Sequence, residues 1–116
     1  MAKLSAHGEE IGRLLVNGGQ AAYMSDGTIL FRSIYHGWKV RGRRKAEVSL
    51  QDWIELKRAR IADAPEWRRV RNIPGRRTLE AWLFDSVCET PSGDLVEPDG
   101  IGPDGAPSWL RLLGLV

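Results

Sequence analysis

Cysteine and histidine are scarce in this 116-residue chain, and their scarcity excludes two kinds of structural crosslink. Cys88 is the only cysteine, so no internal disulfide can form. His7 and His36 are the only histidines, and together with one cysteine they do not supply the four ligands of a structural zinc site. The sequence therefore predicts neither a metal nor any other cofactor.

Long apolar runs are also missing. No stretch approaches the roughly 20 apolar residues of a membrane-spanning helix, and the start, MAKLSAHG, lacks the apolar core of a signal peptide. These absences predict a cytoplasmic protein that contacts no membrane. The chain does contain 42% apolar residues, including five tryptophans, which supply much of the area that a core can bury. At this length a single domain, residues 1–116, is expected.

The first 45 residues predict a small antiparallel sheet. Asp26 and Gly27 stand between two apolar runs, and this pair favours a tight β-turn because both central positions of such a turn can require a positive φ. Gly12 lies inside the first run, where a bulge is expected. The third run has apolar side chains on both faces, which is typical of a central strand. The four predicted strands are residues 10–16, 20–25, 28–35 and 38–41.

Three or four short helices are predicted to pack on this sheet. Ser49 is the expected cap of the first, with Asp52 at the third helical position. The apolar stripe of this helix consists of Leu50, Trp53, Ile54 and Ile61. Lys57 lies within the stripe, and it either lays its stem along the edge of the core or contacts an acidic partner.

Two more helices are expected before residue 90. Pro65 suits the first turn of a short helix that runs to Val70. Thr78 is the expected cap of the next helix, which runs from Leu79 to about Cys88. The side chains predicted on its apolar stripe are Leu79, Trp82, Leu83 and Val87, widened towards full burial by Phe84 and Cys88.

The last quarter of the chain is rich in glycine, proline and aspartate. Residues 90–107 are too dense in turn signals for a helix, and they predict an ordered loop. The anchors expected to pin this loop to the core are Leu95, Val96 and Ile101. Ser108 is the expected cap of a final helix, Trp109 to Leu113, whose apolar side chains are predicted to dock on the domain.

No catalytic constellation emerges from the residue types or their spacing. Cys88 on an apolar helix is typical of a buried structural cysteine, and His36 beside Gly37 is typical of a turn residue. The Gly18-Gly19 pair lacks the strand–loop–helix context and the lysine of a phosphate-binding loop. The chain is therefore expected not to be an enzyme.

Charge is strongly segregated along the chain. Residues 32–77 hold 14 basic and five acidic residues, a net charge of +9, whereas residues 78–116 carry a net charge of −6. Arginine predominates over lysine, and its planar guanidinium suits bidentate contact with carboxylate or phosphate. The residues predicted to contact a partner are Lys39, Arg41, Arg43, Arg44, Lys45, Arg68, Arg69, Arg71, Arg76 and Arg77. Three interpretations stay open: an acidic protein partner, nucleic acid, or a plain solvated face.

Two segments resemble known sequences. The opening, LSAHGEEIGR followed by YMSDGTIL and HGWKV, resembles the openings of small proteins of bacteriophages and other bacterial mobile elements. The ending, VEPDGIGPDGAPSWLRLLGL, resembles the tails of other such proteins. In those tails cysteine and histidine often occupy the places held here by Gly102, Asp104 and Ala106, a departure that argues against metal binding in this chain.

The resemblance implies a setting, namely a small accessory protein of a phage in the cytoplasm of its host. Proteins of this size in that setting include anti-CRISPR proteins, other inhibitors of host defence, and small transcription regulators. The expectation is therefore an α+β domain that binds and inhibits a host protein or nucleoprotein complex, such as a CRISPR effector, without catalysis. The alternative is a basic regulator that contacts nucleic acid through the arginine-rich residues 39–77.

Overall fold

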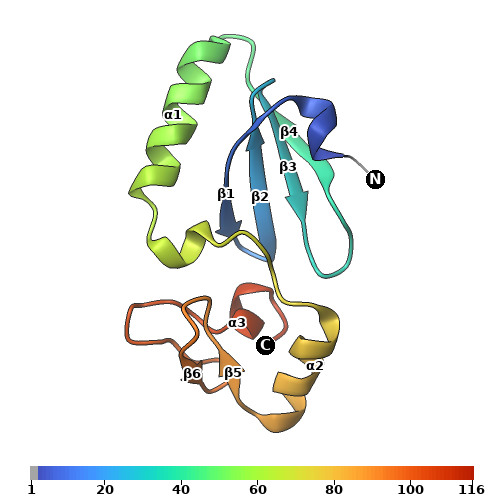
Figure 1. The fold of residues 1–116 in the computed structure, drawn as a ribbon, viewed down its shortest axis with the longest axis vertical. Helices are drawn as coiled ribbons and strands as arrows, with labels where there is room; N and C mark the ends of the chain where they lie inside the picture. The colour runs from blue at the N-terminus through green and yellow to red at the C-terminus, as the bar shows by residue number, and fades with distance from the viewer. Residues whose placement is uncertain (1–2) are drawn as a thin grey trace.

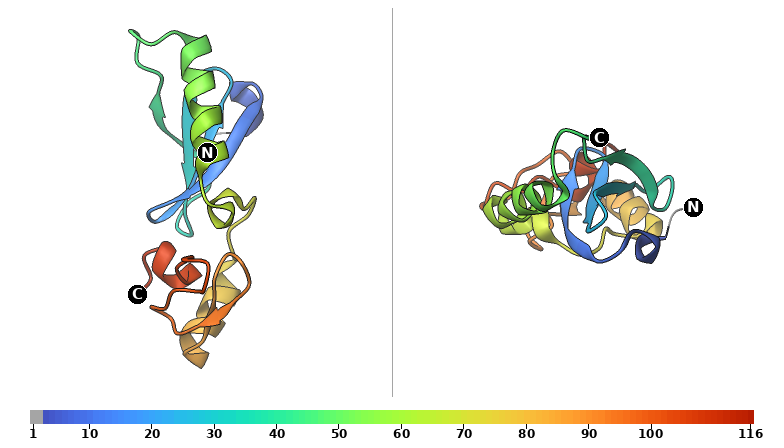
Figure 2. Two further views of the ribbon diagram at one scale, coloured as in Figure 1. Left: turned by 90° about the vertical axis from the view of Figure 1, so that its left-hand side faces the viewer. Right: turned by 90° about the horizontal axis from the view of Figure 1, so that it is seen from above.

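A computed structural model describes residues 3–116, so the first two residues of the predicted domain lie outside the description. The fold is α+β, as predicted, and it is built in two parts along an axis of 47 Å (Figure 1). The first part holds a four-stranded sheet and the longest helix. The second part holds two shorter helices and a two-stranded sheet. A single stretch of chain after the 3₁₀ helix η2 (Glu66–Arg69) connects the parts (Figure 2).

All four predicted strands are present in the larger sheet. They are β1 (Glu10–Val16), β2 (Gly19–Met24), β3 (Thr28–Arg32) and β4 (Lys39–Arg43), antiparallel and paired in that order. The expected bulge lies between Glu10 and Gly12. In the β2–β3 loop only Gly27 has a positive φ, +91°. Asp26 instead fixes the turn through its side chain, which accepts a hydrogen bond from the Thr28 amide at 2.9 Å.

Three strands differ from the prediction at their ends, β2 by only one residue at each end. β3 stops at Arg32, because the chain turns back and the Ser33 amide donates a hydrogen bond to the His36 carbonyl. β4 starts after Trp38 and continues to Arg43. Arg43, which lies beyond the predicted fourth strand, is therefore part of β4.

Helix α1 (Leu50–Asp63) covers one face of the sheet (Figure 1). The Ser49 side chain accepts a hydrogen bond from the Asp52 amide at 3.1 Å, which confirms the predicted cap. Trp53 is buried among side chains of β1 and β2, with the helix residues Ile54 and Ile61 packed around the cluster. The sheet residues of this cluster are Leu14, Ala21 and Tyr23, joined by Ile11, Val16 and Ile29.

Two residues at the edge of α1 refine the predicted stripe. Leu50 is 37% exposed and does not belong to the buried cluster. The Lys57 ammonium lies 5.4 Å from the Tyr23 ring and 5.8 Å from the Trp53 ring. Burial lowers the pKa of Lys57, and the nearby Arg60 lowers it further. These contacts support the interpretation in which the lysine stem lies along the core edge.

The other face of the sheet carries a smaller apolar cluster. Ala22, Met24 and Leu30 are buried there, and Leu4 and Trp38 pack against them. Leu4 belongs to η1, a 3₁₀ helix (Leu4–His7) that was not predicted. β3 therefore has apolar contacts on both faces, as expected for an inner strand.

The second part starts beyond η2 and has little regular structure. The helix η2 (Glu66–Arg69) precedes this part. Its own elements are α2 (Arg76–Asp85), β5 (Cys88–Glu89), β6 (Leu95–Val96) and α3 (Trp109–Leu112). The prediction for α2 was wrong at both ends. The helix begins two residues before Thr78, with Gly75 as its cap. It ends because Ser86 adopts a left-handed conformation with φ 57°, and Cys88 consequently lies in β5.

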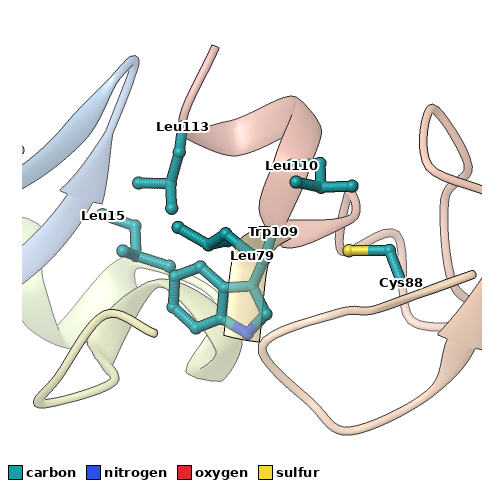
Figure 3. Close-up of a cluster of buried hydrophobic side chains, with 6 residues drawn as sticks. All are labelled: Leu15, Leu79, Cys88, Trp109, Leu110 and Leu113. Atoms are coloured by element: carbon teal, nitrogen blue, oxygen red, sulfur yellow. The ribbon is translucent and has the colours of Figure 1, made fainter. Parts of the chain in front are cut away.

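One buried cluster joins the two parts (Figure 3). Leu15 of β1 reaches into a group of side chains from α2, β5 and the C-terminal segment. The members are Leu15, Leu79, Cys88, Trp109, Leu110 and Leu113. The Gly18 amide also donates a hydrogen bond to the Leu112 carbonyl at 2.9 Å. The predicted docking of the last helix and its Ser108 cap, which accepts from the Arg111 amide at 3.0 Å, are both confirmed.

The predicted burial of α2 was wrong on its outer side. Leu79 is buried and Trp82 is half-buried, but Leu83 is 44% exposed and Phe84 is 89% exposed. Val87, just beyond the helix, is 42% exposed. The physical reason is that α2 packs along one side only, and no further layer among the described residues covers its other side.

The predicted apolar anchors of the 90–107 loop were also wrong. Leu95 is 71% exposed and Ile101 is 54% exposed, while Val96 is only half-buried. The loop is held by hydrogen bonds instead. The Thr90 amide donates to the Asp94 carbonyl, and the Gly102 amide donates to the Ala106 carbonyl. A turn held in this way needs no apolar side chain to fix its position.

Candidate binding surfaces

The ten basic residues predicted as a contact site fall into three separate groups. The first group follows the outer edge of the sheet and the turn after it, the second lies in and after η2, and the third opens α2. In that order the groups are Lys39, Arg41, Arg43, Arg44 and Lys45; Arg68, Arg69 and Arg71; and Arg76 and Arg77. A continuous basic segment in the sequence is thus spread over three elements.

Two of these residues hold the fold together. The half-buried Arg44 donates from Nη1 to the Val48 carbonyl at 2.6 Å, and its backbone amide donates to the Gly27 carbonyl at 2.7 Å. Arg68 donates from Nε to the Leu15 carbonyl at 3.0 Å. Arg68 thereby ties η2 to the free side of β1. Both guanidinium groups therefore donate hydrogen bonds to backbone carbonyls of the same chain.

The first group forms an exposed cationic surface along the edge of the sheet. β4 is the last strand of the sheet, and within residues 3–116 no strand pairs with its outer side. Lys39, Arg41 and Arg43 are all exposed. The Arg41 guanidinium lies 4.5 Å from the Phe31 ring, and Arg43 Nη1 donates to Thr28 Oγ1 at 3.3 Å. These contacts orient the two arginines without neutralising their charges.

A second arginine cluster lies where the connection to the second part crosses the sheet. The carbonyl of Arg71 accepts hydrogen bonds from Arg13 Nη1 at 2.9 Å, Arg32 Nη2 at 3.1 Å and Gln20 Nε2 at 3.2 Å. Glu10 accepts from Arg13 Nε through both carboxylate oxygens, each at 2.8 Å. Burial lowers the pKa of Arg32, and the neighbouring Arg13 lowers it further. This cluster ties the two parts together.

The sequence analysis missed this arginine cluster. Arg13 and Gln20 are polar residues inside strands, and in hindsight that position is the signal for a buried polar contact. The guanidinium groups of Arg13 and Arg32 lie 5.2 Å and 4.7 Å from the centre of the Trp38 ring. Trp38 therefore serves as a packing surface for two arginines.

The residues considered for catalysis or metal binding make structural contacts. The His7 ring lies 3.0 Å from the Asp26 carboxylate, and His36 Nδ1 lies 2.7 Å from the Gly37 carbonyl. Cys88 is fully buried, and its Sγ–H donates to the Glu89 carbonyl at 3.2 Å. Among residues 3–116, no three histidine, cysteine or acidic side chains gather as a metal site would require. None of the helices described is long and apolar enough to cross a membrane.

Asp104, in the loop of residues 90–107, also has a structural role. Its carboxylate accepts hydrogen bonds from the Ser92 hydroxyl and from the Ala106 amide. These bonds lower the pKa of Asp104 despite the opposing effect of burial. The carboxylate therefore closes a turn of the loop.

Two open clefts flank Trp67 where the two parts meet. One, of about 570 Å³, has Arg68 and Arg111 on its walls, and the other, of about 530 Å³, has Glu66 and Asp104. The basic and the acidic side chains thus lie in different clefts.

Comparison of the chain with protein-family models, with curated proteins and with solved structures gave no match. The function is therefore inferred from the surfaces of the molecule.

Proposed function

We propose that this chain is a non-catalytic binding protein that docks on an acidic surface of a host protein or nucleoprotein complex and inhibits it. The observation that carries the proposal is the outer edge of β4, where Lys39, Arg41 and Arg43 are exposed beside an unpaired strand edge. The resemblance to small phage proteins supplies the context. It makes host-defence complexes of the cytoplasm, CRISPR effectors included, the first partners to test.

An edge of this kind suits an extended acidic segment of a partner. The outer side of an edge strand presents backbone N–H and C=O groups that an incoming strand can pair with. Cations along the same edge attract acidic segments and accelerate their association. Among the described residues, the ion pairs of arginine involve Arg13, Arg71 and Arg76, so the β4 cations have no acidic partner there.

Charged edge strands have a second role that must be distinguished from binding. Lysine and arginine on an edge also prevent sheets of different molecules from pairing. A protective edge and a binding edge respond differently to substitution. Removing protective charges promotes aggregation, whereas removing binding charges leaves a soluble protein that has lost its partner.

The alternative is a nucleic-acid-binding regulator that contacts phosphates through residues 39–77. The prevalence of arginine there favours it. Two features speak against it. The basic residues are divided over three elements, and the Trp38 ring, which could stack on a base, already has the guanidinium groups of Arg13 and Arg32 over it.

Charge reversal on β4 tests the proposal. The variant Arg41→Glu/Arg43→Glu is compared with Arg58→Glu/Arg60→Glu, which reverses two exposed arginines of α1 and lowers the net charge equally. Tagged proteins are used to capture partners from host extract, with and without nuclease, and the captured complex is then assayed for inhibition. We expect the β4 variant to lose capture and inhibition and the α1 variant to keep both. Equal capture by the two variants would overturn the proposal.

A gel shift with generic duplex DNA tests the alternative. If residues 39–77 bind phosphates, the affinity falls steeply with salt because each neutralised phosphate releases counterions. The variant Arg43→Ala/Lys45→Ala should then weaken binding to all sequences about equally. Absence of binding at low salt removes the alternative and leaves the protein-binding proposal standing.

A further inference from the structure

Helix α2 carries charges that oppose the helix dipole at both ends, whereas α1 does so only at its last residue, Asp63. In α1 an acidic residue, Asp52, lies in the first turn and Arg60 lies in the last, which is the arrangement that the helix dipole favours. In α2 the first turn carries Arg76 and Arg77, and the helix ends at the acidic Asp85. Each of these placements destabilises an isolated helix slightly. A helix keeps such unfavourable charges where the charged residues have a function outside the helix.

The two ends of α2 add to this departure. The cap residue of α2 is Gly75, which has no side chain to accept a hydrogen bond from the helix, whereas the Ser49 side chain caps α1. At the other end the non-glycine residue Ser86 takes the left-handed conformation. The sequence of α2 is thus not optimised for a helix in water.

The outer side of α2 is apolar at its C-terminal end. Phe84 is 89% exposed, and Leu83 and Val87 are each more than two-fifths exposed. Tyr35, which is 71% exposed, borders the same hollow of about 190 Å³ as Leu83. Contiguous exposed apolar side chains on a small protein mark a contact surface.

The charges of α2 point to the occupant of the side that carries Phe84, because Arg77, Ala81 and Asp85 share that side, whereas Leu83 faces the opposite way. A helix that is positive at its start and negative at its end is complementary to another copy of itself only when the two run antiparallel. A twofold axis near Ala81, which is exposed and small, brings Arg77 of each copy beside Asp85 of the other, because both lie four residues from the axis. The same geometry places Phe84, three residues from the axis, next to the other copy's α2.

We propose that two copies of this chain associate through antiparallel α2 helices that meet at Ala81, with Phe84 of each copy against the other helix and Arg77–Asp85 pairs at the two ends. The proposal is independent of the β4 surface. Arg76 is already 3.8 Å from Glu80 of its own helix, which leaves Arg77 as the cation for the partner. One helix pair buries less area than a stable complex of standard size. The dimer is therefore weak, and the dimeric fraction rises with protein concentration.

Sedimentation velocity over a wide concentration range tests the proposal. The wild-type mass is expected to rise from one chain towards two. Phe84→Glu should weaken self-association about tenfold or more, whereas Leu95→Glu, at a comparably exposed residue of the same part, should leave it unchanged. A wild type that stays monomeric throughout, or a Phe84→Glu protein that still dimerises like the wild type, would overturn the proposal.

A charge swap separates this geometry from every other mode of association. Arg77→Glu and Asp85→Arg should each weaken the dimer, because each leaves like charges facing one another. The double variant Arg77→Glu/Asp85→Arg should restore it, because an antiparallel pair regains opposite charges at both ends. Far-ultraviolet circular dichroism checks that each variant is folded. If the double variant is as weak as the single ones, then α2 does not pair with itself antiparallel, even if it captures a different protein.

Discussion

The two parts of the molecule are stabilised in different ways. In the first part, a regular sheet carries apolar clusters on both faces, and the helix over it has the cap and the acidic first turn that an isolated helix would prefer. In the second part, short elements contribute a few side chains to one cluster, and a loop of 18 residues is held largely by its own turns.

The second part shows how a segment with little regular secondary structure is held in one conformation. In the second part, buried polar groups such as Thr90 and Ser108 take the place of strand pairing, and each makes hydrogen bonds to the loop backbone. The first part should therefore tolerate loss of one polar contact better than the second. Three pairs of substitutions test how the two parts are stabilised.

The largest effect is expected from Trp109→Ala. Trp109 is 7% exposed in the cluster that joins the two parts, and truncating such a residue costs roughly 3–5 kcal/mol. Because Leu15 of β1 belongs to the same cluster, we expect the whole chain to unfold in one transition at a lower midpoint, as the predicted single domain requires. Thermal and denaturant unfolding measure both.

Phe84→Ala is the matched control for Trp109→Ala. Phe84 is an aromatic residue of the same part, but it is 89% exposed, so its truncation should change the free energy of unfolding by less than about 0.5 kcal/mol. If Trp109→Ala leaves the midpoint unchanged, the cluster does not stabilise the fold. Two separate transitions would show that the parts unfold independently.

An intermediate effect is expected from the helix caps. Ser108 is fully buried, and its hydroxyl accepts from the Arg111 amide and donates to the Pro98 carbonyl. Ser49 is exposed and accepts from the Asp52 amide only. We expect Ser108→Ala to cost about 2 kcal/mol and Ser49→Ala about 0.5–1 kcal/mol. Equal losses in chemical denaturation would contradict the greater dependence of the second part on buried polar contacts.

The smallest effect concerns pH. Partial burial raises the pKa of Asp26, but hydrogen bonds from Thr28 and the neighbouring His7 outweigh it, so the pKa is lowered on folding. A lowered carboxyl pKa adds stability above the unfolded value of about 3.9, and this stability is lost as the pH falls through the folded pKa. The Asp26 side chain is 41% exposed, which keeps the contribution below about 1 kcal/mol.

Asp26→Asn should accordingly lower the stability near neutral pH by up to about 1 kcal/mol and flatten the acid limb of the stability–pH curve, so that the variant and the wild type converge below about pH 4. Asp104→Asn makes the matching change in the second part, because hydrogen bonds from Ser92 and Ala106 lower the pKa of Asp104 as well. Denaturant midpoints between acid and neutral pH measure both. An Asp26→Asn curve that runs parallel to that of the wild type would contradict the assigned role of the carboxylate.

The sequence was most informative where local chemistry determines local structure. The turn at Gly27 and the caps at Ser49 and Ser108 involve residues close together in the chain, and all three were predictable. The exposure of Phe84 was not. Helical periodicity shows which residues share a side of a helix, but not how many sides of that helix the rest of the chain can cover.

The candidate surfaces were predictable only as a list of residues. The charge of the segment indicated a cationic surface, but a linear run of arginines does not reveal that β4, η2 and α2 lie apart. It also does not reveal that Arg44 and Arg68 bond to backbone carbonyls of the same chain. Such contacts depend on which segments meet in space, and in a chain of this size that is decided by the packing of the whole.

The single buried thiol gives the second part a built-in kinetic reporter. Cys88 has no accessible surface in the folded state, so a thiol reagent can react only during an opening of the surrounding cluster. The labelling rate, divided by that of an unfolded reference, gives the free energy of that opening without any substitution. Comparison with the free energy of global unfolding would then show whether the C-terminal half opens by itself, and how often it does so in the native protein.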